Sequence, residues 1–136
     1  VKMNDYTSGD IIKLNEISDG RGSLIALESL KNIPFDIKRV YCLYDLEDAR
    51  GFHAHKKLNQ VMICLSGSVK VTLETVHGKT EHLLDSRSEG LFIGFGAWRV
   101  MSDFSFGAVI MVLADQLYDE DDYIRDFDAF KLFVGS

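Results

Sequence analysis

The sequence predicts an all-β protein, a barrel or sandwich of short strands with a short C-terminal helical extension. Three observations support this prediction. Short apolar stretches recur along the chain, and Gly, Asp, Asn and Ser separate them. Residues 69–74 alternate between apolar and polar side chains, as a half-buried strand does. Proline, which interrupts strands, occurs only once in the 136 residues.

The expected strands follow one another along most of the chain. Ser66-Gly67-Ser68 and His77-Gly78-Lys79 interrupt the apolar pattern as turns or bulges. Strands at this spacing are typical of a sandwich or barrel. In chain order, the expected strands are 11–17, 23–28, 38–46, 52–56, 60–76, 80–84, 91–102 and 108–114.

Only the last segment, 119–133, is expected to be helical. Tyr123, Phe127 and Phe130 recur in it at helical spacing, and acidic residues cluster at its start, where the helix dipole favours negative charge. We expect this segment to pack over the barrel rather than to bind a ligand. The chain contains no internal repeat or interdomain linker, so residues 1–136 are expected to form one domain.

Composition narrows the class of protein. The net charge of −6 argues against a nucleic-acid-binding surface. No apolar run approaches the roughly 20 residues of a membrane span, and the N-terminus has no apolar signal-peptide core. A cytoplasmic location is therefore expected. Cys42 and Cys64 lie in strand patterns and are expected to be buried apolar residues rather than a disulfide.

Residues 50–57, Arg-Gly-Phe-His-Ala-His-Lys-Lys, are the most informative part of the chain. They place His53 and His55 two apart in an expected strand, so both side chains should face the same side of the sheet. Two neighbouring imidazoles indicate either a metal site or proton transfer. Basic residues gather between positions 38 and 57, which fits either a pocket for a small anion or an ordinary solvated face.

A barrel of short strands with His-x-His on one of them resembles a cupin. The metal-binding cupin pattern would place Glu at position 60 and His at position 99, where this chain has Gln60 and Arg99. A neutral amide is a poor ligand for a divalent cation, and arginine has no lone pair to give. We therefore expect no metal and no other cofactor. Arg99 should also disfavour protonation of a neighbouring His, which leaves an imidazole free to act as a base.

Four segments resemble, in order, the dTDP-4-oxo-6-deoxy-D-glucose 3,4-ketoisomerases, which are WxcM-like cupins of bacterial sugar-nucleotide pathways. These segments are 19–24, 32–41, 50–58 and 118–125, and the run at 50–57 is quite specific. The resemblance implies a metal-free jelly-roll homodimer with exchanged N-terminal strands. Its substrate would be a dTDP-linked 4-oxo-6-deoxyhexose. The product would feed 3-amino-3,6-dideoxyhexose biosynthesis for surface polysaccharides and S-layer glycans.

The resemblance also implies the chemistry. The C4 ketone acidifies the hydrogen on C3, a base removes it, an enediol forms, and a proton returns to C4 as the carbonyl moves to C3. His55 is implied as the base, and His53 as a second proton handler or a group that holds the hexose oxygens. Tyr41 could donate to a carbonyl or hydroxyl oxygen.

Arginines and a lysine are implied as substrate-binding residues: Arg21 and Arg99 for the hexose, and Arg39, Arg50 and Lys56 for the diphosphate. Some relatives carry His directly after the Trp of the second cupin motif, and others pair Arg there with Tyr at the position of Arg21. This chain has Arg at both positions, so a galacto or a gluco product stays open. Trp98 is expected in the core rather than under a base, and His77 and His82 are expected to have no role.

Other functions stay open at this point. A sugar-nucleotide 3,5-epimerase also works through an enolate, but it typically pairs a His base with an Asp and a Tyr acid. A non-catalytic sugar-nucleotide-binding module, alone or within a larger bifunctional protein, would not require a proton carrier. A metal-dependent cupin oxygenase is the weakest candidate because the ligand positions hold Gln60 and Arg99.

Overall fold

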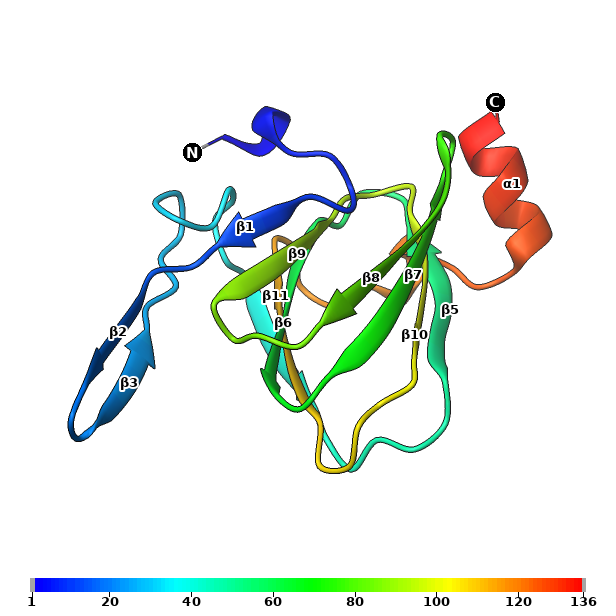
Figure 1. Ribbon diagram of the computed structural model, residues 1–136. Coiled ribbons are helices and arrows are strands. Elements are labelled where there is room, and N and C mark those ends of the chain that lie inside the picture. The colour runs from blue at the N-terminus through cyan, green and yellow to red at the C-terminus, as the bar shows by residue number, and fades with distance from the viewer. Residues whose placement is uncertain (1, 136) are drawn as a thin grey trace.

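The computed structural model describes residues 2–135, which form two antiparallel five-stranded sheets and a separate hairpin (Figure 1). The first sheet contains, in spatial order, β1 (Ile11–Lys13), β9 (Glu89–Ile93), β6 (Gln60–Ser66), β11 (Val109–Ala114) and β4 (Arg39–Leu43). The second sheet contains β12 (Tyr123–Ile124), β5 (Arg50–His55), β10 (Trp98–Ser102), β7 (Val69–Thr75) and β8 (Gly78–Leu84). The prediction of an all-β protein is confirmed.

The main core lies between the two sheets. Met62 and Ile110 from the first sheet and Val71 and Met101 from the second belong to one buried cluster. Burying an apolar side chain of this size contributes roughly 1.5–3 kcal/mol. Strand β7 alternates between buried and partly exposed residues, as the pattern over 69–74 predicts. The packed sheets form the predicted jelly-roll architecture.

Three of the expected strands are in fact two strands each. Gly67, which separates β6 from β7, has a φ of +76°, and a Cβ there would lie 2.3 Å from Ser105 Oγ. Gly96, between β9 and β10, has a φ of +75°. Glycine adopts these conformations without a steric penalty, so both positions become turns rather than bulges. The strands that divide are 11–17, 60–76 and 91–102.

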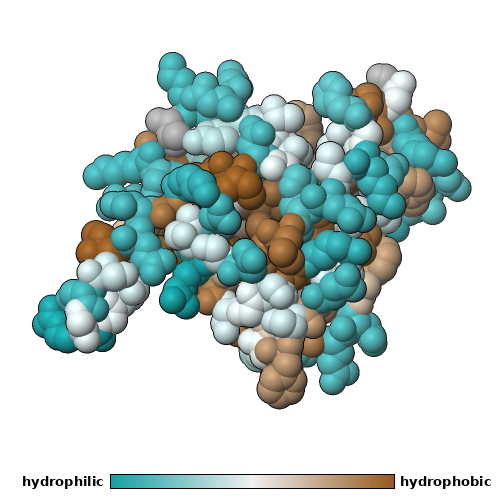
Figure 2. All heavy atoms as spheres, in the orientation of Figure 1, coloured by the Kyte–Doolittle hydropathy of each residue, from teal (hydrophilic) through white to brown (hydrophobic). Residues whose placement is uncertain are grey.

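The hairpin of β2 (Glu16–Asp19) and β3 (Gly22–Ile25) stands out from the sheets (Figure 1). Within residues 2–135, its two strands pair only with each other. Ile17 and Leu24 are 58% and 55% exposed, although both are large and apolar. The surface view shows the same arm extending from the body with a hydrophilic tip (Figure 2). The hairpin therefore leaves apolar side chains uncovered in a single chain.

The prediction of a helix over 119–133 is wrong for its first half. A single 3-10 turn, η2 (Glu120–Asp122), leads into β12, where Tyr123 pairs with His55 and Ile124 pairs with Ala54 of β5. The helix α1 spans Phe127–Gly135 and covers the second sheet beside β5 (Figure 1). Across residues 2–135, no helix is long and apolar enough to cross a membrane.

Trp98 and the cysteines test three smaller predictions. Trp98 is 9% exposed, and its ring centroid lies 5.2 Å from that of Phe127 and 5.7 Å from that of Phe130. It is therefore a core residue, as predicted. Both cysteines are free, and Cys64 is buried as predicted. Cys42 is exposed, because it alternates along β4 with the inward-facing Tyr41.

Candidate active site

A pocket of about 430 Å³ is lined by β4, β5, β10 and the C-terminal tail. Six of its lining residues carry polar side chains: Arg39, Tyr41, Arg50, His53, Tyr123 and Arg125. A pocket of about 470 Å³ lies elsewhere, beside the N-terminal 3-10 turn η1 (Met3–Asp5). Its lining includes none of the residues that the sequence predicts for the site. The smaller pocket is therefore the candidate active site because of its residues and not because of its volume.

The two histidines face the same side of β5, as their spacing predicts. Their ring centroids are 5.1 Å apart, and the rings are nearly perpendicular. An irregular backbone precedes them, since Gly51 and Phe52 have φ values of +100° and +53°, and the pairing with β10 shifts register at Arg99. A Cβ on Gly51 would lie 2.8 Å from the carbonyl oxygen of Arg99. The glycine before the histidine run is therefore required by this close approach.

His55 is the more deeply buried of the pair, with 1% of its side chain exposed. Its Nδ1 lies 3.1 Å from Oδ2 of Asp122, and its Nε2 is buried without a hydrogen-bond partner among the described residues. Burial, followed by the charge of Arg99, lowers the pKa of His55 from 6.5 to about 2. Although the Asp122 carboxylate acts in the opposite direction, His55 is neutral at pH 7, as the sequence analysis expects of a base.

His53 lines the pocket directly. Its Nδ1 lies 2.9 Å from the carbonyl oxygen of Gly51, which can only accept, so Nδ1 carries the hydrogen. Burial, followed by the charge of Arg99, lowers the pKa of His53 from 6.5 to about 4. Both histidines are therefore neutral imidazoles, and the Nε2 atom of His53 is a lone-pair acceptor.

Arg99 lies behind the pocket, 1% exposed, and is not one of the lining residues. Its Nη1 donates to Gln60 Oε1, and its Nη2 donates to the carbonyl oxygen of Ala97 at 3.1 Å. Burial lowers the pKa of Arg99 to about 10, which leaves it positively charged at neutral pH. In the single chain Arg99 therefore acts on the histidines through its charge, and its predicted place in the lining of a hexose pocket stays a prediction.

Gln60 connects Arg99 to Tyr41. Because Oε1 accepts from the guanidinium, the amide nitrogen faces the other way and donates to Tyr41 Oη at 3.0 Å. The Tyr41 oxygen is thereby used as an acceptor, and its own hydrogen is free for donation. Burial raises the pKa of Tyr41, so its hydroxyl stays protonated at neutral pH. Tyr41 therefore has the properties of a hydrogen-bond donor at the pocket wall.

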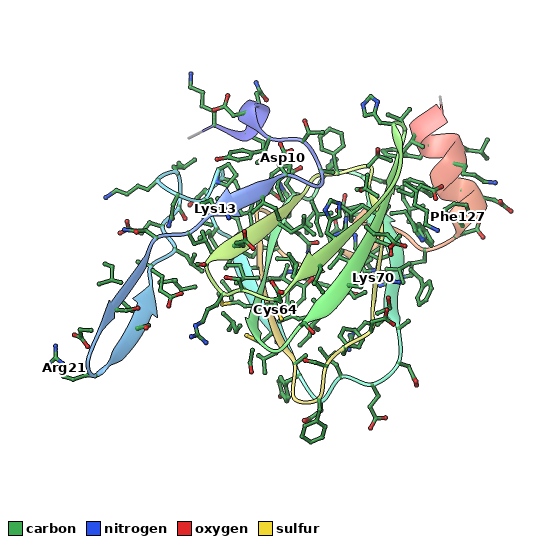
Figure 3. All side chains as sticks on the ribbon, viewed as in Figure 1. Asp10, Lys13, Arg21, Cys64, Lys70 and Phe127 are labelled. Atoms are coloured by element: carbon green, nitrogen blue, oxygen red, sulfur yellow. The ribbon has the colours of Figure 1, made fainter. Side chains whose placement is uncertain are left out.

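The other predicted substrate-binding residues divide into two groups. Arg39 and Arg50 line the pocket, and within residues 2–135 the buried Nε and Nη2 of Arg39 have no hydrogen-bond partner. Lys56 is exposed and lies outside the lining. Arg21 lies at the tip of the β2–β3 hairpin, where it pairs with Asp19 at 2.9 Å (Figure 3). The single chain therefore does not bring Arg21 or Lys56 to the histidines.

The C-terminal tail supplies residues to which the sequence analysis gives no site role. The ring centroid of Tyr123 lies 5.0 Å from that of His53 and 4.4 Å from that of His55. The guanidinium of Arg125 lies 4.1 Å above the Tyr123 ring and bonds Glu120 at 2.7 and 2.9 Å. The sequence indicates this group only through residues 118–125, one of the four segments that resemble the 3,4-ketoisomerases.

The other two histidines, His77 and His82, lie outside the lining of this pocket. His82 Nε2 lies 2.9 Å from Thr80 Oγ1, and His77 is exposed, both away from the pocket with His53. In the described part of the chain, no group of three or more His, Cys, Asp or Glu side chains is placed to hold a metal ion. Gln60, at the usual Glu position of metal-binding cupins, is instead bonded to Arg99.

Comparisons with known proteins agree with this geometry. The family FdtA, described as WxcM-like, C-terminal, matches residues 7–135. A TDP-4-oxo-6-deoxy-alpha-D-glucose-3,4-oxoisomerase from Aneurinibacillus thermoaerophilus is 52% identical over 127 residues, which cover 92% of this chain and 91% of that protein.

Two solved structures share the whole architecture. One is a mutant of the 3,4-ketoisomerase QdtA from Thermoanaerobacterium thermosaccharolyticum in complex with TDP-4-keto-6-deoxyglucose, with 44% identity, a TM-score of 0.91 and 95% of each chain covered. The other is a 3,4-ketoisomerase from Helicobacter canadensis, with 44% identity and a TM-score of 0.92. That match covers 96% of this chain and 100% of the other.

Proposed function

The chain belongs to the FdtA family of WxcM-like proteins, and from this premise we propose that it is a sugar-nucleotide 3,4-ketoisomerase. It converts dTDP-4-oxo-6-deoxy-D-glucose to the dTDP-3-oxo-6-deoxyhexose in the cytoplasm, on the way to a dideoxyaminosugar. One observation supports this function most strongly: the neutral His55 has a buried Nε2 without a hydrogen-bond partner among residues 2–135, next to a pocket lined by three arginines. A neutral imidazole with a free ring nitrogen can accept a carbon-bound hydrogen.

In the proposed reaction, His55 Nε2 removes the hydrogen from C3 while the carbonyl oxygen at C4 becomes an enolate oxygen. Tyr41 gives its free hydrogen to that oxygen, and the nearby charge of Arg99 stabilises the negative charge as it develops. The enediol then loses the hydrogen of its C3 hydroxyl to His53 Nε2, and His55 returns its proton to C4. The proton on His53 passes back to the Tyr41 oxygen through the pocket that both residues line, which restores both groups. The net change moves one hydrogen from C3 to C4 and one proton from O3 to O4, without a metal or redox cofactor.

For substrate binding, we assign the diphosphate to Arg39 and Arg50, whose guanidinium groups can form bidentate contacts with phosphate oxygens. Arg21 reaches a sugar only if the β2–β3 hairpin crosses to a second copy of the chain. The exposed Ile17 and Leu24 on that hairpin support a homodimer with exchanged N-terminal strands. The mass of the protein in solution, measured by light scattering, tests this arrangement.

A 3,5-epimerase is the second candidate, because His55 contacts Asp122 and two tyrosines, Tyr41 and Tyr123, line the pocket. A His–Asp pair with a Tyr acid is the combination that the sequence analysis associates with epimerases. The products separate the two functions. Carbon-13 NMR of the labelled hexose shows the carbonyl at C3 for a ketoisomerase, whereas an epimerase leaves it at C4.

A further inference from the structure

Asp122 lies against the edge of the His55 ring that carries Nδ1. Its Oδ2 is 3.1 Å from His55 Nδ1, and only 10% of its side chain is exposed. We propose that Asp122 is a positioning residue that fixes His55 as the Nδ1–H tautomer, with the Nε2 lone pair directed toward the substrate. This inference rests on the proposed function only for its kinetic consequence, since the tautomer can be measured without any substrate.

The hydrogen bonds around Asp122 determine the direction of the contact. Its Oδ1 accepts from the backbone N–H of Lys57 at 2.8 Å, and its Oδ2 also accepts from that of Leu58 at 3.3 Å. Backbone N–H groups only donate, so both carboxylate oxygens are used as acceptors. An ionised carboxylate has no hydrogen to give, and the shared hydrogen must therefore lie on His55 Nδ1. Nε2 is then left as the acceptor.

The Asp122 carboxylate comes from the turn η2 in the C-terminal tail and not from a long strand of either sheet. Lys56 N–H donates to the carbonyl oxygen of Asp122 at 3.0 Å, and the next residue, Tyr123, pairs with His55 across β12 and β5. The docked tail therefore fixes Asp122 at both its backbone and its side chain. A ring held by packing alone could flip or change tautomer, whereas this contact selects one orientation.

The variant Asp122→Asn separates positioning from structure. The amide oxygen can still accept from Lys57 N–H, but the amide group that replaces Oδ2 then faces His55 Nδ1 as a donor. Because that donor needs Nδ1 as an acceptor, the ring hydrogen moves to Nε2. His55 then has no lone pair at Nε2 with which to accept a proton from the substrate. We expect kcat to fall about 10²- to 10⁴-fold, as for other His bases that lose their orienting carboxylate, with KM changed less than about threefold. Asp121→Asn is the matched control, because Asp121 is exposed on the same turn.

The test combines these kinetics with long-range proton–nitrogen NMR of protein labelled at histidine. The expected result is a wild-type His55 protonated at Nδ1, an Asp122→Asn His55 protonated at Nε2, and an unchanged Asp121→Asn variant. Wild-type His55 protonated at Nε2 would overturn the inference, even if Asp122→Asn did not fold. Retention of wild-type kcat by a folded Asp122→Asn protein would also overturn it. If the wild type does not isomerise the sugar, the proposed function fails, but the tautomer result still decides the inference.

Discussion

Replacing His55 by Asn removes the proton-accepting nitrogen but keeps a nitrogen at the place of Nδ1. The amide nitrogen of Asn can occupy the place of Nδ1 and donate to Asp122, whose contact at 3.1 Å is thereby kept. The change removes the other edge of the ring, including Nε2. Since Nε2 has no hydrogen-bond partner among the described residues, its removal breaks no internal hydrogen bond.

The expected magnitudes follow from these contacts. One positioned acid or base contributes about 10²- to 10⁴-fold to the rate, and in the proposed reaction the same ring both removes and returns a proton. We therefore expect kcat to fall at least about 10³-fold, which corresponds to about 4 kcal/mol of transition-state stabilisation. The free energy of unfolding should change by no more than about 1 kcal/mol, or about 4 °C in Tm. Affinity for dTDP should be unchanged, because phosphate binding is assigned to Arg39 and Arg50.

The assay follows loss of the 4-oxo sugar by NMR, together with thermal melting and calorimetric titration with dTDP. His77→Asn is the matched control, since it makes the same substitution at an exposed position away from the site. Wild-type turnover in His55→Asn would refute the assignment of His55 as the base. Loss of the folded state would refute the argument that Nε2 has no structural role.

Three further predictions concern binding, cofactors and pH. Arg39→Ala should raise KM about tenfold or more with kcat nearly unchanged, and an unaltered Kd for dTDP in calorimetry would remove Arg39 from the diphosphate site. Treatment with a chelator should leave activity unchanged, and a loss that added metal restores would contradict the cofactor-free reaction. Because the pKa values of His53 and His55 are lowered to about 4 and about 2, both rings stay neutral in the folded protein at about pH 5.5, and kcat/KM should be level from about pH 8 to that value. The unfolded chain binds these protons near pH 6.5, so this stability is fully present above that pH. Below it, the free energy of unfolding should fall by up to about 1.4 kcal/mol per pH unit for each histidine, and Tm should fall with it. A Tm independent of pH between about 6.5 and 5 would contradict the burial of the two rings.

Local patterns were sufficient to predict the sheets and the paired histidines. The alternation over 69–74 gave β7, and the two-residue spacing of His53 and His55 placed both rings on one side of β5. These signals depend only on the period of a strand, which a single sequence displays directly. The strand ends were less certain because a glycine such as Gly67 ends a strand through its φ and its contacts, which the apolar pattern does not reveal.

The tail and the burial of Arg99 could not be predicted in the same way. Tyr123 matches the helical spacing of Phe127 and Phe130, yet it pairs with β5. A strand of two residues is too short to show an alternating pattern, so the helical spacing is the only pattern visible in this segment. Asp122 and His55 are 67 residues apart, so only the folded topology brings them together. Arginine is almost never fully buried unless it is paired. The sequence shows Gln60 only as a missing metal ligand and does not reveal that it is the hydrogen-bond partner of the buried Arg99.

The central claim is that the chain moves a hydrogen from C3 to C4 of a 4-oxo sugar through His55. Proton NMR of the purified protein with dTDP-4-oxo-6-deoxyglucose in D2O tests this claim most directly. We expect the carbonyl to move from C4 to C3, the coupling constants at C4 of the product to identify it as gluco or galacto, and His55→Asn to leave the 4-oxo sugar unchanged. A carbonyl that stays at C4 while deuterium enters C3 or C5 would contradict the account and indicate an epimerase.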